Sequence, residues 1–321
     1  MNILITSAGR RVSLVRAFKN EVKLFFPDSK VFTSDMNPKL SAACNVSDGY
    51  FKMKSVGDPS YINDLLELCL AQKIKLVVPT IDTELQVLAN HKDSFAERGI
   101  HLVVSSADFI SKCRDKRKTN QFFEQCGITI PAAIDKQNPT FPLFIKPYDG
   151  SLSADIFIVR RPEELTHYHM TNEKLLFMEY IDKAEHDEYT VDMYYGKDNQ
   201  VKCIVPRRRI EIRGGEISKG ITSKNIIVPY LKEKIGHIAG AIGCLTVQVF
   251  LNKNTHQIYG IEINPRFGGG YPLSYQAGAN YPNWLVKEYL LSEEIPYTDN
   301  WSNNLLMLRY DDEVLVHNYE I

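Results

Sequence analysis

A short stretch near the carboxyl-terminal end, GIEINPRFGGG, combines polar side chains with three successive glycines. Side chains on a β-strand alternate between its two faces, so Glu262 and Asn264 share one face, and Arg266 follows two residues later. Upstream, Gln248 interrupts the apolar segment LTVQVFL. If the two strands pair as a hairpin through the NKNTH turn, positions 248 and 262 lie opposite each other. Gln248, Glu262 and Asn264 then converge on one point.

This grouping favours a magnesium site beside a phosphate. One carboxylate and two amide oxygens suit Mg²⁺, which keeps several waters and accepts phosphate oxygens for the rest of its shell. A buried Glu262 without a cation would be costly. Glycines 268–270 let the backbone approach a ligand closely. A half-exposed strand face with ordinary polar residues remains the alternative interpretation.

Two lysines and two glutamates extend the pattern. Lys146 ends the apolar strand PLFIK just before the Gly/Ser loop YDGSLS, as a phosphate ligand would. Lys116, in RDKRKT, opens a predicted helix. Glu179 and Glu188 lie on predicted strands, within reach of a nucleobase and a ribose if the ligand is a nucleotide. Taken singly, Lys116 is better explained as a solvated lysine and each glutamate as a surface carboxylate.

Arginine-rich segments provide candidates for recognising an acid. In PRRRIEIRGGEISKG we assign Arg209, Arg213 and Lys219 to acid or phosphate contacts, because guanidinium groups clamp carboxylates and phosphates. A charged edge strand that discourages aggregation is the competing explanation. Arg10 and Arg11 enter the first predicted helix at its amino end, where they either hold a small anion or are simply solvated.

The elements that must position these residues begin with an alternation of strands and helices. Apolar strands are predicted over residues 2–6, 30–35, 75–82 and 100–106, and helices over 10–26, 61–72 and 83–99. Strands that are apolar on both faces and separated by helices indicate a parallel sheet, so residues 1–110 are predicted to form a Rossmann-like α/β domain. The first turn, TSAGRR, lacks the G-x-G-x-x-G fingerprint of dinucleotide-binding proteins. Asp35, at the end of a strand, is by itself weak evidence for an acid that binds the ribose of NAD. An NAD-dependent oxidoreductase is therefore disfavoured.

The rest of the chain has an α+β pattern. A helix pair is predicted over residues 106–128 with Ser106 as a cap, a helix opens near Pro162, and a long helix is predicted over 226–244. Strands are predicted over residues 142–147, 156–160, 174–181, 188–196, 200–212, 245–252 and 257–265. The predicted domains are 1–110, 111–295 with a lid lobe at about 120–180, and a strand-rich tail over 296–321.

Composition excludes several classes of protein. Of the 321 residues 44% are hydrophobic and 24% charged, and the formal net charge is −1, which is ordinary for a globular protein and argues against a general nucleic-acid binder. The six cysteines are scattered without zinc spacing and are expected to be reduced thiols. No signal peptide or membrane span is apparent. We therefore expect a cytoplasmic location with no nucleic-acid or membrane partner.

The order of these motifs resembles the ATP-grasp superfamily, and within it the carbamoyl-phosphate-synthase-like, carboxylate–amine ligase branch. The resemblance rests on a lysine after RD, a strand lysine before a Gly/Ser loop, MEYI, EYTVD, a strand glutamine and EINPR, and it spans about residues 115–280. Residues 1–110 resemble the domain that precedes the ATP-grasp fold. The family fold holds ATP between two α+β lobes.

The resemblance implies a role for each candidate. Lys116 and Lys146 would contact ATP phosphates or the adenine edge, and Arg266 the γ-phosphate and an acyl phosphate. The adenine and ribose would be held by Glu179, by the backbone of Tyr180 and Ile181, and by Glu188. Gln248 with Glu262 would hold one Mg²⁺, and Glu262 with Asn264 a second; Mn²⁺ is an alternative ion. The loop DGSLSADIF is poorer in glycine than is usual, although Gly150 and Ser151 can still offer backbone amides.

The implied activity is that of an ATP-dependent ligase. Such an enzyme activates a carboxylate as an acyl phosphate for attack by an amine or similar nucleophile and releases ADP and phosphate. A single ATP-grasp unit disfavours full carbamoyl phosphate synthetase activity. The alternative is a nucleotide-binding regulatory module without turnover. Expected partners are a small carboxylate and an amine, and a homodimer is possible.

Overall fold

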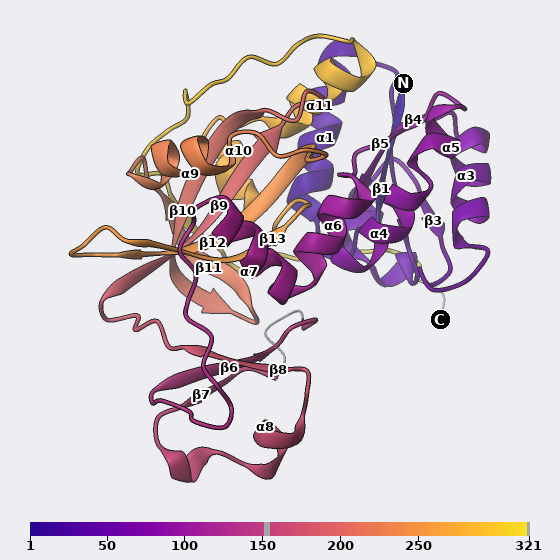
Figure 1. Cartoon of the computed structure of the whole chain (residues 1–321). Helices are drawn as coiled ribbons and strands as arrows, with labels where there is room; N and C mark the ends of the chain where they lie inside the picture. Colours follow the sequence, from indigo (N-terminus) through magenta and orange to yellow (C-terminus); the bar gives the residue numbers. More distant parts are fainter. Residues whose placement is uncertain (151–154, 320–321) are drawn as a thin grey trace.

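Three β-sheets organise residues 1–150 and 155–319, the part of the chain that this computed structural model describes. One is a five-stranded parallel sheet, one a six-stranded antiparallel sheet and one a three-stranded antiparallel sheet. Figure 1 shows the three-stranded sheet in a lobe of its own below the six-stranded sheet, with the parallel sheet beside the latter.

The parallel sheet confirms the Rossmann-like prediction. Its strand order is β3-β2-β1-β4-β5. The strands are β1 (Asn2–Thr6), β2 (Val31–Asp35), β3 (Tyr50–Lys52), β4 (Ile74–Pro79) and β5 (His101–Leu102). The helical segments are α1 (Val12–Phe25), η1 (Pro38–Leu40), α2 (Ala42–Val46), α3 (Tyr61–Ala71), α4 (Asp82–Asn90) and α5 (Lys92–Ala96). Successive residues such as Ile3, Leu4 and Ile5 are fully buried because both faces of the sheet are covered.

The six-stranded sheet has the order β13-β12-β9-β10-β11-β14. Its strands are β9 (His186–Tyr195), β10 (Val201–Arg213), β11 (Glu216–Thr222), β12 (Gly243–Asn252), β13 (Ile258–Asn264) and β14 (Leu306–Leu308). The predicted hairpin is confirmed, because β12 and β13 pair antiparallel with Gln248 opposite Glu262. Strand alternation and a short turn were sufficient to fix this register.

The small sheet has the order β7-β6-β8, with β6 (Leu143–Pro147), β7 (Phe157–Val159) and β8 (Leu175–Glu179). The lobe also contains η2 (Pro162–Glu164) and α8 (His167–Thr171), and the predicted helix pair before it is α6 (Ala107–Arg114) and α7 (Lys116–Gln125). The Ser106 hydroxyl accepts a hydrogen bond from the Phe109 amide at 3.3 Å, so its predicted cap is confirmed. The lobe has a small apolar core of its own that includes Leu143, Ile145 and Phe177.

Several sequence predictions were wrong. The helix predicted over 226–244 is α9 (Ile227–Ile235) only, because the Gly236 carbonyl accepts from the Val201 amide at 2.7 Å and the backbone then turns. The helix predicted over 83–99 is divided into α4 and α5 at His91, and β5 covers two residues of the predicted strand 100–106. Strands β3 and β11 were not predicted. Among the described residues of 296–319, only the edge strand β14 is regular, so the tail is not strand-rich.

A shared apolar core fixes the parallel sheet against the glycine-rich end of β13. Phe18 of α1 packs edge-on against Phe267, with ring centroids 6.0 Å apart, and Phe267 in turn contacts Tyr271 at 4.7 Å. Tyr271 lies in α10 (Tyr271–Gln276), which is followed by α11 (Tyr281–Leu290). Burying an aromatic ring of this size is worth several kcal/mol (roughly 3–5 on truncation to alanine). The segment after Glu262 and Asn264 is therefore held rigidly between two domains.

Candidate functional site

The predicted carboxylate and amide group forms on the β12–β13 hairpin. Glu262 Oε1 accepts from Gln248 Nε2 at 2.8 Å and from Asn264 Nδ2 at 2.9 Å. All three side chains are half-buried. The group holds one carboxylate and two amides, and the described residues contain no cluster of three His, Cys, Asp or Glu side chains arranged for a metal. Its oxygens nevertheless match the donors that Mg²⁺ accepts when phosphate and water complete the shell.

Two lysines from other elements face this group. Lys146, at the end of β6, is only 5% exposed, and burial lowers its pKa to about 8, an effect partly offset by Glu262 and increased by Lys116. Burial also lowers the pKa of Lys116, at the start of α7, with Glu262 again opposing the shift. Lys116 Nζ donates to the Gly150 carbonyl at 2.6 Å. The side-chain nitrogen of Lys146 forms no hydrogen bond or ion pair with any residue that the structure describes. A buried, unpaired ammonium is expensive unless an anion joins it.

The candidates for holding a base and ribose lie along β8 and β9. Glu179 ends β8, and its carboxylate accepts from the Ala132 amide at 3.1 Å. Tyr180 and Ile181 follow, half-buried and buried respectively. Glu188, on β9, accepts from Lys183 Nζ at 3.2 Å.

Arg209 also binds Glu188. Its Nη1 donates to Glu188 at 2.7 Å and to Gln248 Oε1 at 3.4 Å, and its Nε is buried with no partner among the described residues. The structure thus places Arg209 between two side chains of the predicted nucleotide site, at a position that the prediction of an acid contact did not anticipate.

Arg266 reaches a residue of the parallel-sheet domain. Its Nη2 donates to Asp82 Oδ2 at 2.8 Å, and Asp82 begins α4. Arg266 Nε is buried and has no partner among residues 1–150 and 155–319. The strand end that carries Glu262 and Asn264 is therefore tied to the first domain by an ion pair.

Other predicted residues are placed differently. Arg213 pairs with Asp311 on an exposed hairpin tip, and Lys219 pairs with Glu211 at 2.6 Å with its side chain 45% exposed. The structure does not bring these two to Glu262 or Arg266. Ser151 lies outside the described residues.

Sequence analysis missed a group of charged residues near Arg266. Glu216 lies 2.9 Å from Arg309 and 3.7 Å from Arg11. Arg11 had been noted for its place at a helix start, but nothing in the local sequence of Glu216 or Arg309 singled them out. Asp82 follows the strand segment KLVVPT, and a polar residue at that edge of a parallel sheet was the available signal.

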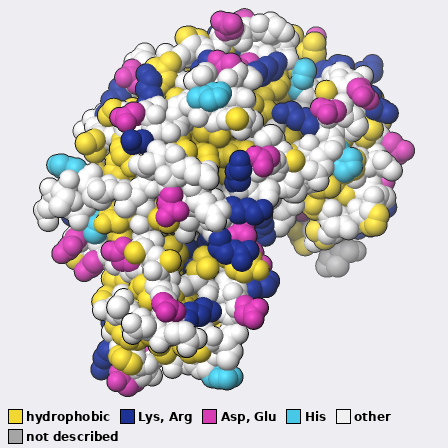
Figure 2. Space-filling view, viewed as in Figure 1, with side chains coloured by type: hydrophobic (Ala, Val, Ile, Leu, Met, Phe, Trp, Pro, Cys, Tyr) yellow, Lys and Arg dark blue, Asp and Glu magenta, His cyan; other side chains and the backbone are white. Residues whose placement is uncertain are grey.

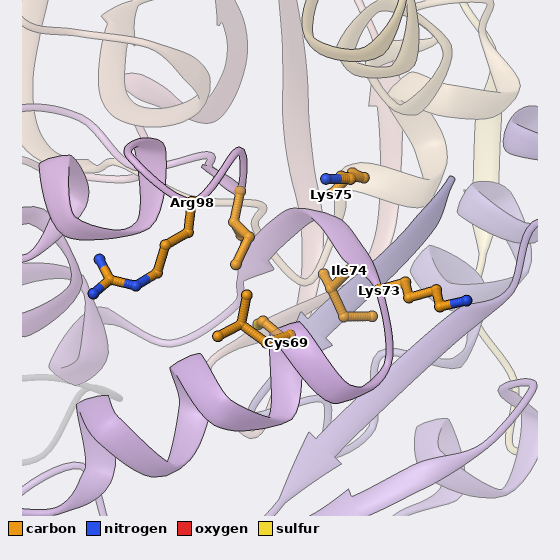
Figure 3. A pocket seen from close by; sticks show the side chains of 7 residues that line it. Cys69, Lys73, Ile74, Lys75 and Arg98 are labelled. Atoms are coloured by element: carbon orange, nitrogen blue, oxygen red, sulfur yellow. The ribbon is translucent and has the colours of Figure 1, made fainter.

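The molecular surface agrees with this location. Figure 2 shows Lys and Arg side chains gathered on the face where the small-sheet lobe meets the main body. A cavity of about 280 Å³ lies elsewhere, at the amino ends of β4 and β5. In Figure 3 its cationic residues Lys73, Lys75 and Arg98 point in different directions, so the cavity does not form a converging anion site. No helix in the described part of the chain is long and apolar enough to span a bilayer.

Comparisons with known proteins agree with these observations. Residues 3–103 match the family of PylC-like N-terminal domains, and residues 171–309 match the family described as ATP-grasp in the biosynthetic pathway with Ter operon. A carbamoyl-phosphate synthase from Methanobrevibacter smithii is 23% identical over 223 residues, which cover 63% of this chain and 60% of that protein. The matched region thus spans less than two thirds of that relative.

Solved structures share the fold. The biotin carboxylase domain of 2-oxoglutarate carboxylase from Hydrogenobacter thermophilus, a dimer solved with MgADP, ADP and bicarbonate, has a TM-score of 0.71 at 16% identity, covering 95% of this chain and 73% of that one. An L-amino acid ligase from Bacillus licheniformis has a TM-score of 0.67 at 17% identity, covering 90% and 74%. At such low identity these likenesses concern the fold alone. Together with the two family matches, they show an ATP-grasp fold that follows a PylC-like N-terminal domain, and the chain is similar to the carbamoyl-phosphate-synthase-like, carboxylate–amine ligase branch of the ATP-grasp superfamily.

Proposed function

We propose that this protein is an ATP-dependent ligase that activates a carboxylate as an acyl phosphate, which an amine or similar nucleophile then attacks. The nucleotide would lie between the small-sheet lobe and the β12–β13 hairpin. ADP and phosphate are the other products.

The observation that carries the proposal is that two lysines and one glutamate from three different elements influence one another's charge. Lys146 comes from β6 and Lys116 from α7, whereas Glu262 comes from β13, and the charge of Glu262 affects the pKa of both lysines. Burial of the Lys146 ammonium carries a desolvation cost that the charge of Glu262 offsets only in part. A polyphosphate with its cation would satisfy both sides, because the lysines need an anion and Glu262 needs a cation.

The chain's own residues account for positioning and charge. Lys116 and Lys146 hold the phosphates, while Glu179, Tyr180 and Ile181 line the base and Glu188 bonds the ribose. Gln248, Glu262 and Asn264 fit Mg²⁺, which when bound would neutralise phosphate charge; two ions, with Mn²⁺ as an alternative, are part of the proposal.

Arg266 stabilises negative charge on the transferring phosphoryl group. Such electrostatic placement supplies most of the catalysis in phosphoryl transfer, which needs no protein nucleophile.

Arg209 must change partners if Glu188 is to hold a ribose. In the structure its guanidinium donates to Glu188 and reaches Gln248. Nucleotide binding would free it, with its unpaired Nε, for phosphate or acid. Arg213 and Lys219 remain weaker candidates for acid contacts, since both are paired on the surface.

Relatives support the class of reaction. The solved biotin carboxylase domain was bound to MgADP and bicarbonate, another solved protein is an L-amino acid ligase, and the sequence relative is a carbamoyl-phosphate synthase. The names of these proteins and of their bound molecules include a nucleotide, an acid and an amino acid. The dimeric biotin carboxylase domain also leaves a homodimer as a reasonable assembly for this chain.

The test measures ADP release with a panel of carboxylates and amines, in the presence of Mg²⁺, with hydroxylamine as a trap. We expect ADP release to require an acid, and hydroxylamine to convert the activated acid to a hydroxamate. ATP binding without acid-dependent ADP release for any acid in the panel would instead support a regulatory module.

A further inference from the structure

A cluster of charged side chains lies where the parallel-sheet domain meets the end of β13. It contains three arginines and two carboxylates: Arg11, Arg266, Arg309, Asp82 and Glu216. Arg11 comes from the start of α1, Asp82 from α4, Glu216 from β11, and Arg309 follows β14. Five elements that are far apart in the sequence therefore contribute to one place.

The glycine run connects this cluster to the proposed site of phosphoryl transfer. A Cβ atom on Gly269 would lie 2.5 Å from Glu216 Oε1 and 2.9 Å from Arg11 Nη1. The backbone three residues after Arg266 thus lies directly against the Arg11–Glu216 pair. A side chain at this position would have to displace the ends of Glu216 and Arg11, so the glycine leaves room for the present contact.

The charges in the cluster do not balance. Three guanidinium groups face two carboxylates, which leaves one positive charge. The Arg11–Glu216 contact is long, at 3.7 Å. Burial lowers the pKa of Arg11, and Arg266 lowers it further, although Glu216 and Asp82 oppose the effect. An anion that contacts Arg11 more closely than Glu216 does would offset this repulsion better.

Glu216 occupies the position that such an anion would take. Although burial raises the pKa of its carboxyl group, Arg309 and Arg11 outweigh burial and lower it. Its side chain is 30% exposed and stands at the start of β11, next to the Gly214–Gly215 turn. Rotation about the side-chain bonds of Glu216 can therefore move its carboxylate toward solvent while β11 stays in place.

We infer that Arg11 and Arg309 bind a carboxylate group of a substrate in place of Glu216. This carboxylate takes no part in the reaction. The inference rests on the proposed ligase function, in which Arg266 serves the carboxyl group being activated. This inference restricts the possible substrates: either the acid is a dicarboxylate or the amine is an amino acid. Arg11 is then a specificity-determining residue supplied by the first domain.

Matched probes separate the two sources of this carboxylate. In one arm succinate is compared with propionate, and in the other L-alanine is compared with ethylamine. Binding of each probe to the whole protein with MgADP is measured by calorimetry, and KM and kcat are measured by ADP release. Arg16, exposed on the same helix, provides the control variant Arg16→Gln.

We expect Arg11→Gln to weaken binding of succinate or of L-alanine by about 10- to 100-fold, the worth of a charged hydrogen bond. Propionate and ethylamine should be unaffected, and Arg16→Gln should match the wild type. Glu216→Gln should tighten binding of the same carboxylate, because the competing anion is gone. A purely structural role would make Arg11→Gln and Glu216→Gln change binding in the same direction.

The subsite is refuted if neither succinate nor L-alanine binds the wild-type protein, or if Arg11→Gln binds them normally. It is also refuted if ADP release is supported by propionate and ethylamine as well as by the carboxylate-bearing probes. These outcomes leave the ligase proposal standing. Conversely, Arg11-dependent binding without ADP release from any pair would retain the subsite and reject the ligase.

Discussion

Replacing Lys146 by methionine is expected to stabilise the unliganded protein and to weaken nucleotide binding at the same time. Lys146 is 5% exposed, and burial lowers its pKa from 10.5 to about 8. The charged form therefore costs the folded state about 3 kcal/mol at pH 7. Methionine keeps the length of the side chain without the charge, so Lys146→Met removes that cost.

The sign of the pH dependence follows from the lowered pKa. Below pH 8 the amine is protonated in both the folded and the unfolded chain, and the full cost applies. Between pH 8 and 10.5 the folded protein loses the proton first, so the cost falls to about 1 kcal/mol at pH 10. The stability advantage of Lys146→Met over the wild type should thus shrink as the pH rises from 7 to 10.

Chemical denaturation at the two pH values measures this advantage, and a fluorescent ATP analogue measures binding. We expect nucleotide affinity to fall about 10- to 100-fold in Lys146→Met, since a charge-assisted hydrogen bond to phosphate is lost. Lys39→Met, on the exposed surface, is the matched control. A variant that is less stable than the wild type at pH 7, with unchanged nucleotide affinity, would refute the reasoning.

Three further predictions concern the site and its support. Glu262→Gln should lower ADP release more than about 100-fold with the fold intact by circular dichroism, because several kcal/mol of charge stabilisation is lost; near-normal turnover would remove the metal assignment. Arg207→Leu should lower the free energy of unfolding, measured by chemical denaturation, by about 3–5 kcal/mol. The reason is that Arg207 donates hydrogen bonds of 2.8 and 3.0 Å to the fully buried Asp192, which would lose its counter-charge. An unchanged free energy of unfolding would show that Asp192 is protonated at little cost. Gly270→Ala should lower the melting temperature, since its Cβ would clash with the Arg207 guanidinium that Asp192 holds in place, and an unchanged melting temperature would show that Arg207 can move.

Much of the candidate site could be predicted from local sequence patterns. Gln248 and Glu262 were predicted to lie opposite each other, and they do, because alternation and a short turn leave one register that buries the apolar face. Lys146 was identified because a lysine at the end of a core strand is unusual. The long helix predicted over 226–244 failed because helical spacing cannot reveal that the Gly236 carbonyl bonds to a distant strand.

The sequence by itself determined the classes of sheet, the β12–β13 hairpin and the resemblance to ATP-grasp proteins, since each depends on periodicity or on motifs within a few dozen residues. Only the tertiary structure decided which charges meet across domains. Arg266 pairs with Asp82, 184 residues away, and Glu216 pairs with Arg11 and Arg309. No local pattern encodes such pairs, because a charged side chain costs little wherever it stays in water. Its partner is set by how the two domains pack around Phe18 and Phe267.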